Sequence, residues 1–330
     1  MLSYLLFQWA SCLRRFALLL TVLIIPASFS VAADDDYLRS DFAPSFSPDG
    51  NQVVYYSYRG RPSDFPDLYI YDVRTGVERQ LTNTADQWEI EPVWLPDGDL
   101  IQFAGGPSMA ELSTQVIKPD GNGRRSVSYG RGEGPAYWSP DGRFLTMRTP
   151  YGDNGVSQLM IYDPSTEATH TIETGLPGQN TIPSWSPDGQ HLVFSHKPLG
   201  QERGGELYRI NINGGEADRL THNNMEEYKT SWSPDGKAIF FMANEHNGPS
   251  HIYRVSAFGG AAVRMTSDNN SPAYFPEVSA DGTTVYFSGL NAKGETRIMA
   301  LPANARQQQA LEIEDMVEQR SINEERSNDR

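Results

Sequence analysis

The chain has 330 residues, a formal net charge of −15 and one cysteine. This length allows two average domains or one large all-β domain, and a single cysteine excludes an internal disulfide framework. The acidic balance argues against a nucleic-acid binder, which needs a basic surface to replace counterions. The 29 glycines, 22 prolines and 11% aromatic residues are typical of a turn-rich β protein.

The N-terminal segment has the pattern of a secretory signal peptide. Arg14 and Arg15 precede the apolar run Phe16–Ile25, and small residues follow at the expected cleavage point. We therefore expect residues 1–33 to be a signal peptide and the protein to lie in the periplasm, without a membrane span after cleavage. Because Leu2–Trp9 is also apolar, an uncleaved N-terminal anchor remains an alternative.

One unit recurs six times along the rest of the chain. Each copy has a large apolar residue, a group resembling Ser-Pro-Asp-Gly and then an apolar run typical of a strand. Successive copies are 44 to 48 residues apart, a period that indicates a repeat architecture. The copies are Phe46–Gly50, Trp94–Gly98, Trp138–Gly142, Trp185–Gly189, Trp232–Gly236 and Val278–Gly282.

Each unit contains two further apolar runs at a constant separation. Tyr69 and Leu81 are 12 positions apart, and so are Tyr208 and Leu220. A constant separation predicts a hairpin whose register is fixed by its turn. Each unit is therefore interpreted as four antiparallel strands. Six such units predict an all-β fold, a six-bladed β-propeller of four-stranded antiparallel blades.

The Ser-Pro-Asp-Gly group is interpreted as the turn between the first two strands of each blade. Proline presets φ, aspartate caps the local backbone and glycine accepts positive φ. Six repetitions argue against a catalytic role for these serines and aspartates. The tryptophan or phenylalanine before each group is expected to pack between blades.

These repeats resemble the WD-repeat-like β-propeller repeats of the TolB-type family. The same repeat occurs in the propellers of tricorn-type and prolyl-oligopeptidase-type proteases. The resemblance implies a propeller over about residues 42–313. We expect residues 34–41 to be a short extension in place of the α/β domain that precedes the propeller in TolB. Residues 314–330 are expected to form a charged, disordered tail.

The candidate site is the segment that enters the first strand of each blade. In a propeller this connection crosses one face and descends into the axial channel, so equivalent residues should ring its mouth. Five positions before the large apolar residue of each copy stand Asp41, Glu89, Glu133, Asn180, Glu227 and Ala273. The next position supplies Tyr228 and Tyr274, and Glu91, Lys229 and Glu277 lie close by. If they converge, these side chains form an acidic funnel for a cation, a metal ion or a basic peptide.

Other interpretations of these residues stay open. The acids could instead cap the turn into the first strand, or be solvated. If a metal binds, Ca²⁺ fits carboxylate and amide oxygens best, and no other cofactor is expected. His222 begins a loop on the same face and is the one histidine that we consider a candidate ligand.

Two function classes follow from this pattern. We favour an exported, monomeric, non-catalytic module that binds an envelope protein, a basic peptide segment or a small ligand, and not nucleic acid. The alternative is a lyase or hydrolase acting on carbohydrate or peptide, with loop carboxylates as acid and base and with or without a metal. A third interpretation is a substrate filter for a separately encoded hydrolase.

Overall fold

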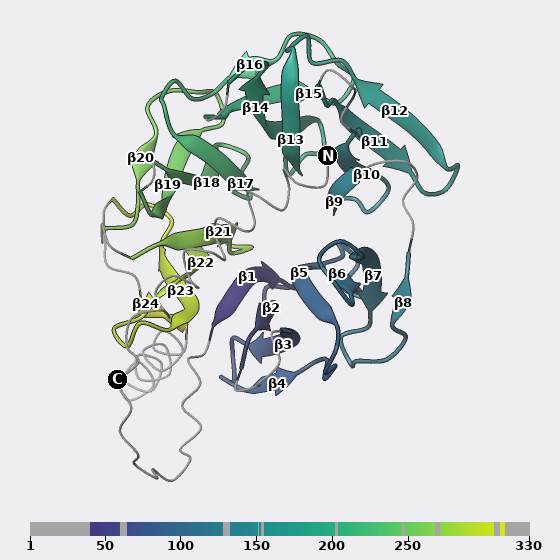
Figure 1. Cartoon of the computed structure of the whole chain (residues 1–330). Coiled ribbons are helices and arrows are strands. Elements are labelled where there is room, and N and C mark those ends of the chain that lie inside the picture. Colours follow the sequence, from purple (N-terminus) through teal and green to yellow (C-terminus); the bar gives the residue numbers. More distant parts are fainter. Residues whose placement is uncertain are drawn as a thin grey trace, which may run out of the picture.

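Six four-stranded antiparallel sheets surround a central axis in the computed structural model (Figure 1). The structure describes residues 40–59, 65–127, 133–150, 152, 155–201, 204–245, 248–267, 271–306 and 311–313, without the side chains of 133–135 and 311. The expected signal peptide and tail lie outside these ranges. No helix within the described ranges has the length and hydropathy of a membrane span.

Each blade is built from four strands that are consecutive in the sequence. Blades 1 to 3 contain β1 (Asp41–Phe46), β2 (Gln52–Ser57), β3 (Asp67–Asp72), β4 (Glu78–Gln80), β5 (Trp88–Trp94), β6 (Ile101–Gly106), β7 (Ser113–Ile117), β8 (Arg125–Ser126), β9 (Glu133–Trp138), β10 (Leu145–Arg148), β11 (Leu159–Asp163) and β12 (Ala168–Ile172). Blades 4 to 6 contain β13 (Gly178–Trp185), β14 (His191–Pro198), β15 (Glu206–Asn211), β16 (Asp218–Arg219), β17 (Glu226–Trp232), β18 (Ala238–Asn244), β19 (Ser250–Ser256), β20 (Val263–Arg264), β21 (Ala273–Val278), β22 (Thr284–Leu290), β23 (Thr296–Pro302) and β24 (Leu311–Glu312).

This arrangement confirms the predicted six-bladed propeller. The first strand of each blade, from β1 through β21, lies nearest the axis (Figure 1). The outer hairpin has the expected constant register, since Tyr69 pairs with Gln80 and Tyr208 pairs with Arg219. The innermost strands therefore hold the residues that can reach the axial channel.

The repeated turns have the predicted chemistry. In the blade 5 turn the Ser233 hydroxyl donates to Asp235 Oδ1 at 2.7 Å, and the Lys237 N–H donates to the same oxygen at 3.0 Å. Gly236 has a φ of +69°, in the left-handed region that glycine adopts without strain. A Cβ at Gly236 would approach Pro187, which belongs to the equivalent turn of blade 4. The turns thus form a closely spaced ring on one face.

Apolar side chains between adjacent blades form most of the core. Separate buried clusters join blades 1 and 2, 3 and 4, 4 and 5, 5 and 6, and 6 and 1. The tryptophans contribute as expected: Trp185 packs between blades 3 and 4, and its Nε1–H donates to the Tyr137 carbonyl at 3.0 Å. Between blades 2 and 3 the described contacts include Gln102, whose Nε2 donates to the Ala136 carbonyl at 2.8 Å.

Blade 6 closes the ring with side-chain contacts to blade 1. Its four described strands all come from the C-terminal repeat, and Ser40, just before β1, forms an isolated parallel bridge with Thr296 of β23. The rings of Phe46 and Tyr286 lie 4.6 Å apart, and the Ala43 N–H donates to Ser288 Oγ at 3.1 Å. Apolar packing, a buried hydrogen bond, the bridge from Ser40 and an ion pair between Arg297 and Asp41 therefore join the two ends of the propeller.

Candidate functional site

Four of the predicted polar residues at the start of the innermost strands, Asp41, Glu89, Asn180 and Glu227, are fully buried. Glu227 is an example: its carboxylate accepts hydrogen bonds from the Leu207 N–H at 3.0 Å, the Thr221 hydroxyl at 2.5 Å and Asn223 Nδ2 at 2.6 Å. Leu207 and Thr221 belong to blade 4, whereas Glu227 belongs to blade 5. Glu227 therefore ties two blades together. Burial raises its pKa to about 7, and Glu206 adds to the shift.

Glu89 has an equivalent role between blades 1 and 2. It accepts hydrogen bonds from Thr82 and from Thr84, the latter at 3.0 Å, and it forms an ion pair with Arg124. Burial raises the pKa of Glu89, while Thr82 and Arg124 oppose that shift. This carboxyl is accordingly enclosed by partners from its own protein.

Asp41 and Asn180 are enclosed in the same way. The Ser57 hydroxyl donates to Asp41 at 2.6 Å, and Arg297 of blade 6 lies 3.4 Å from the carboxylate. Asn180 accepts a hydrogen bond from His196 Nδ1 at 2.8 Å and donates to the Ser157 carbonyl at 2.9 Å. The described members of this column thus have separate partners, and their part in ligand binding stays a prediction.

The remaining predicted residues occupy different environments. Glu133 begins β9, where its backbone pairs with Arg148, but its side chain is outside the described part of the chain. The Tyr228 hydroxyl donates to Glu226 at 2.9 Å, and burial raises the Tyr228 pKa. Tyr274 is half-buried with its ring 6.4 Å from that of Phe275, and His222 is exposed.

A β-bulge follows two positions later in five of the innermost strands. The pairing register shifts within β1, β5, β13, β17 and β21. At each bulge a residue other than glycine has a φ between +46° and +55°. These residues are Ala43, Glu91, Ile182, Lys229 and Phe275. A bulge can re-aim a side chain, and here the same backbone conformation recurs in five blades.

Two of these residues meet across the axis. Lys229 Nζ of blade 5 lies 2.7 Å from Glu91 Oε1 of blade 2, and these two blades are on opposite sides of a six-membered ring. Lys229 Nζ is also 3.4 Å from the Tyr137 hydroxyl and 5.5 Å from the centre of the Phe275 ring. Four blades therefore contribute to one cluster at the channel axis.

The ion pair is partly shielded from solvent. The Lys229 and Glu91 side chains are 20% and 11% exposed, respectively. Burial alone would lower the pKa of Lys229, but Glu91 and Tyr137 outweigh this effect and raise it. The pKa of Tyr137 is raised by burial. The lysine is consequently a permanent cation at neutral pH, held by a carboxylate, a hydroxyl group and an aromatic face.

Glu277 is a second carboxyl at the channel wall. It lies on β21, two residues after Phe275, and its described hydrogen-bond partner is the Ser231 hydroxyl, at 3.5 Å. Among the described residues no lysine or arginine forms an ion pair with it. Burial raises the pKa of Glu277 to about 7. The residue as a whole is half-buried.

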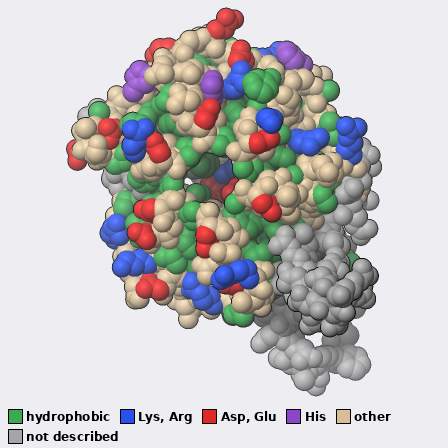
Figure 2. Space-filling view, turned by 180° about the vertical axis from the view of Figure 1, so that it is seen from behind, with side chains coloured by type: hydrophobic (Ala, Val, Ile, Leu, Met, Phe, Trp, Pro, Cys, Tyr) green, Lys and Arg blue, Asp and Glu red, His purple; other side chains and the backbone are tan. Residues whose placement is uncertain are grey.

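The space-filling view agrees with this arrangement. Figure 2 shows an opening at the centre of one face, with both acidic and basic side chains visible inside it. No group of three or more histidine, cysteine, aspartate or glutamate side chains with metal-binding geometry occurs among the described residues. The part of the chain that the structure describes therefore contains no cluster of this kind for the expected Ca²⁺.

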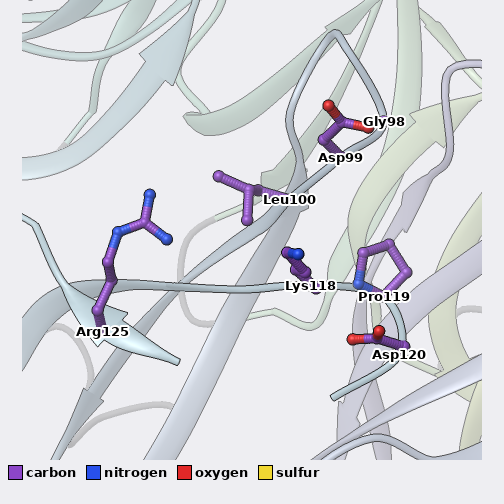
Figure 3. A pocket seen from close by; sticks show the side chains of 7 residues that line it. All are labelled: Gly98, Asp99, Leu100, Lys118, Pro119, Asp120 and Arg125. Carbon is purple, nitrogen blue, oxygen red and sulfur yellow. The ribbon is translucent and has the colours of Figure 1, made fainter. Parts of the chain in front are cut away.

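A separate, open hollow of about 580 Å³ lies on blade 2. Its charged lining comes from Asp99, Lys118, Asp120 and Arg125, all of them exposed (Figure 3). Both signs of charge are present, and none of the described residues that line the hollow is buried. The axial cluster is accordingly the better candidate site.

Sequence reasoning placed Glu91, Lys229 and Glu277 near the site but did not select them. Tyr137 and Phe275 were missed. Proline follows the bulge residue in several blades, as in Pro92 and Pro276, and a proline within a strand indicates a bulge or an edge. That signal would have directed attention to the position before each proline.

The comparisons with known proteins support the fold assignment. Residues 120–324, more than half of the chain, match the TolB beta propeller domain. The chain belongs to this family. An uncharacterised protein of Agrobacterium fabrum, Atu1656, is 26% identical over 68% of this chain and 73% of its own length.

Two solved structures show the same fold at low sequence identity. TolB from Acinetobacter baumannii is 18% identical with a TM-score of 0.56, covering 86% of this chain and 66% of that one. Oligogalacturonate lyase from Vibrio parahaemolyticus is 16% identical with a TM-score of 0.54, covering 84% of this chain and 80% of that one. One neighbour is named as an enzyme and the other is not, so fold likeness does not decide between binding and catalysis.

Proposed function

We propose that this TolB-like propeller is a non-catalytic binding module that receives a basic peptide segment at its axial channel. The carrying observation is Glu277, a half-buried carboxyl on the innermost strand whose described hydrogen bond is a single long contact with Ser231. A carboxylate in that position gains most from a ligand that brings a cation, because burial has already removed much of its hydration.

The surroundings of Glu277 suit an extended peptide. Phe275 offers an aromatic face to apolar or cationic groups, and Glu91 adds a second carboxylate at the axis. The net charge of −15 would attract a basic partner and repel nucleic acid. Rigid blades that share buried clusters would hold these groups in place without induced fit.

The cellular setting belongs to the same proposal. The N-terminal pattern of basic and apolar residues supports export to the periplasm, where the partner would be an envelope protein or a basic segment of one. We propose that the protein acts as a monomer. No cofactor is required for this role.

A peptide selection tests the proposal. Random dodecapeptides displayed on phage are selected on the immobilised protein, and the enriched sequences are counted for lysine and arginine. We expect enrichment of basic sequences, with affinity reduced about tenfold or more by Glu277→Gln. Glu173→Gln removes the same charge from an exposed position on blade 3 and should leave affinity unchanged.

Two outcomes would reject this function. One is enrichment of neutral or acidic sequences. The other is equal binding of basic peptides by the wild-type protein and the Glu277→Gln variant. Turnover of oligosaccharides or peptides by the purified protein would replace the binding role with an enzymatic one.

A further inference from the structure

The ammonium group of Lys229 is bound by three residues from three other blades. Glu91 of blade 2 accepts its hydrogen bond at 2.7 Å, and the Tyr137 hydroxyl of blade 3 lies at 3.4 Å. The ring of Phe275, from blade 6, lies 5.5 Å from Nζ, within the range of a cation–π contact. Carboxylate, phenol and aromatic face together make a cation cage, defined here as Glu91, Tyr137 and Phe275.

The cage and its occupant come from different strands. The three cage residues lie on β5, β9 and β21, whereas Lys229 enters from β17. Lys229 has a φ of +46°, so its own backbone conformation is one that glycine would adopt more easily. The lysine side chain is 20% exposed, so part of it already contacts solvent.

From this geometry we infer that the cage is a binding site for a primary ammonium group, and that Lys229 fills it as an internal ligand in the free protein. A lysine side chain or chain amino terminus of the bound partner displaces Lys229 and takes its place. The inference deepens the proposed function and rests on it, because it names the chemical group of the peptide that reaches the axis.

Exchange of one ammonium for another keeps the buried charge constant. Glu91 stays paired throughout, so the large cost of an isolated buried carboxylate does not arise. The cage already holds a compact ammonium group, which contacts one Glu91 oxygen, the Tyr137 hydroxyl and the Phe275 ring, and a larger planar guanidinium would have to rearrange these contacts. The site should therefore favour lysine or a free amino terminus over arginine.

Chemical rescue provides a direct test. Lys229→Ala removes Cγ, Cδ, Cε and Nζ, and n-propylammonium contains the same set of heavy atoms. We expect Lys229→Ala to melt at lower temperature than the wild-type protein, and propylammonium chloride to raise its midpoint by about 3 °C or more at saturating concentration. Sodium chloride at equal ionic strength and 1-propanol at equal concentration should not.

Matched variants locate the effect. Wild-type protein, in which the cage is filled, should show little response to propylammonium. The double variant Glu91→Gln/Lys229→Ala lacks the carboxylate and should also show none. If Lys229→Ala does not fold, Lys229→Gly serves instead, because glycine adopts a φ of +46° without strain.

The inference is wrong if propylammonium fails to stabilise the vacated variant, or if it stabilises the double variant equally. That failure is distinguishable from failure of the proposed function. Basic peptides could still bind in a Glu277-dependent manner although the cage does not bind an ammonium group. Conversely, rescue could succeed although no basic peptide is enriched.

Discussion

Lys229 and Glu91 stand 138 residues apart in the sequence and form a 2.7 Å ion pair across the centre of the propeller. Their blades are opposite one another, so the pair braces the ring from within, in addition to the contacts that join blades 6 and 1. Because both residues lie at bulges, the brace depends on backbone conformations as well as on charge.

The brace should appear as energetic coupling. Glu91→Gln and Lys229→Met are each expected to lower the free energy of unfolding by about 3 kcal/mol, since each leaves a shielded charge without its partner. The double variant should cost clearly less than the sum, with a coupling of about 1–3 kcal/mol. Urea denaturation of the wild-type protein, the two single variants and the double variant measures this coupling. Additive effects would show that the two charges do not depend on each other.

The free energy of unfolding should decrease as the pH rises from about 4.5 to about 7. Glu277 and Glu227 cause this decrease, because the pKa values of both are raised to about 7. In that window the folded protein holds protons that the unfolded chain has released, so raising the pH favours unfolding. A pKa shift of this size corresponds to a change of about 3 kcal/mol in the free energy of unfolding for each group. Urea unfolding at pH 5 and pH 8 gives the comparison.

Glu277→Gln isolates one of these two contributions. The variant should be more stable than the wild-type protein at pH 8, because it removes a partly buried charge, and roughly half of the pH dependence in this window should disappear. Glu173→Gln, which changes an exposed residue, should keep the wild-type profile. An unchanged profile in Glu277→Gln would mean that Glu277 is ionised at neutral pH like an ordinary surface carboxyl.

The buried carboxyl of Glu227 should be required for stability. Glu227→Gln places an amide NH₂ among the donors of Leu207, Thr221 and Asn223, so at least one donor loses its acceptor. We expect a loss of about 1–3 kcal/mol in thermal or urea unfolding. Normal stability combined with weaker peptide binding would instead favour the original sequence-based assignment of Glu227 to the ligand site.

A glycine of the repeated turn offers a test of the backbone argument. At Gly236, where φ is +69°, alanine should destabilise the protein by about 1–2 kcal/mol. Asparagine tolerates this region better, so Gly236→Asn should cost less than Gly236→Ala. Equal losses would point to the neighbouring Pro187, and not to φ, as the limiting feature.

The sequence was sufficient for the architecture because the information is repeated. Six turns with glycine at the same place, and an outer hairpin of constant register, leave few alternatives to a six-bladed ring. The position of Trp185 in its repeat also predicted packing between blades, although its partner Tyr137 could not be known.

The residues at the axis were harder to predict from the sequence, for a physical reason. Counting along a strand assumes regular alternation of side chains, and a bulge at each innermost strand breaks that alternation. Glu227 therefore turned into the blade interface, while Lys229, two residues later, turned toward the axis. The contact of Lys229 with Glu91 joins opposite blades, which no local pattern reports.

The most direct measurement is a crystal structure of the protein with a bound lysine pentapeptide. We predict peptide density over the axial opening, with an ammonium group within hydrogen-bond distance of the Glu277 carboxylate. Peptide bound only on the outer strands, with the axial cluster unchanged and Glu277 still facing Ser231 alone, would contradict the account.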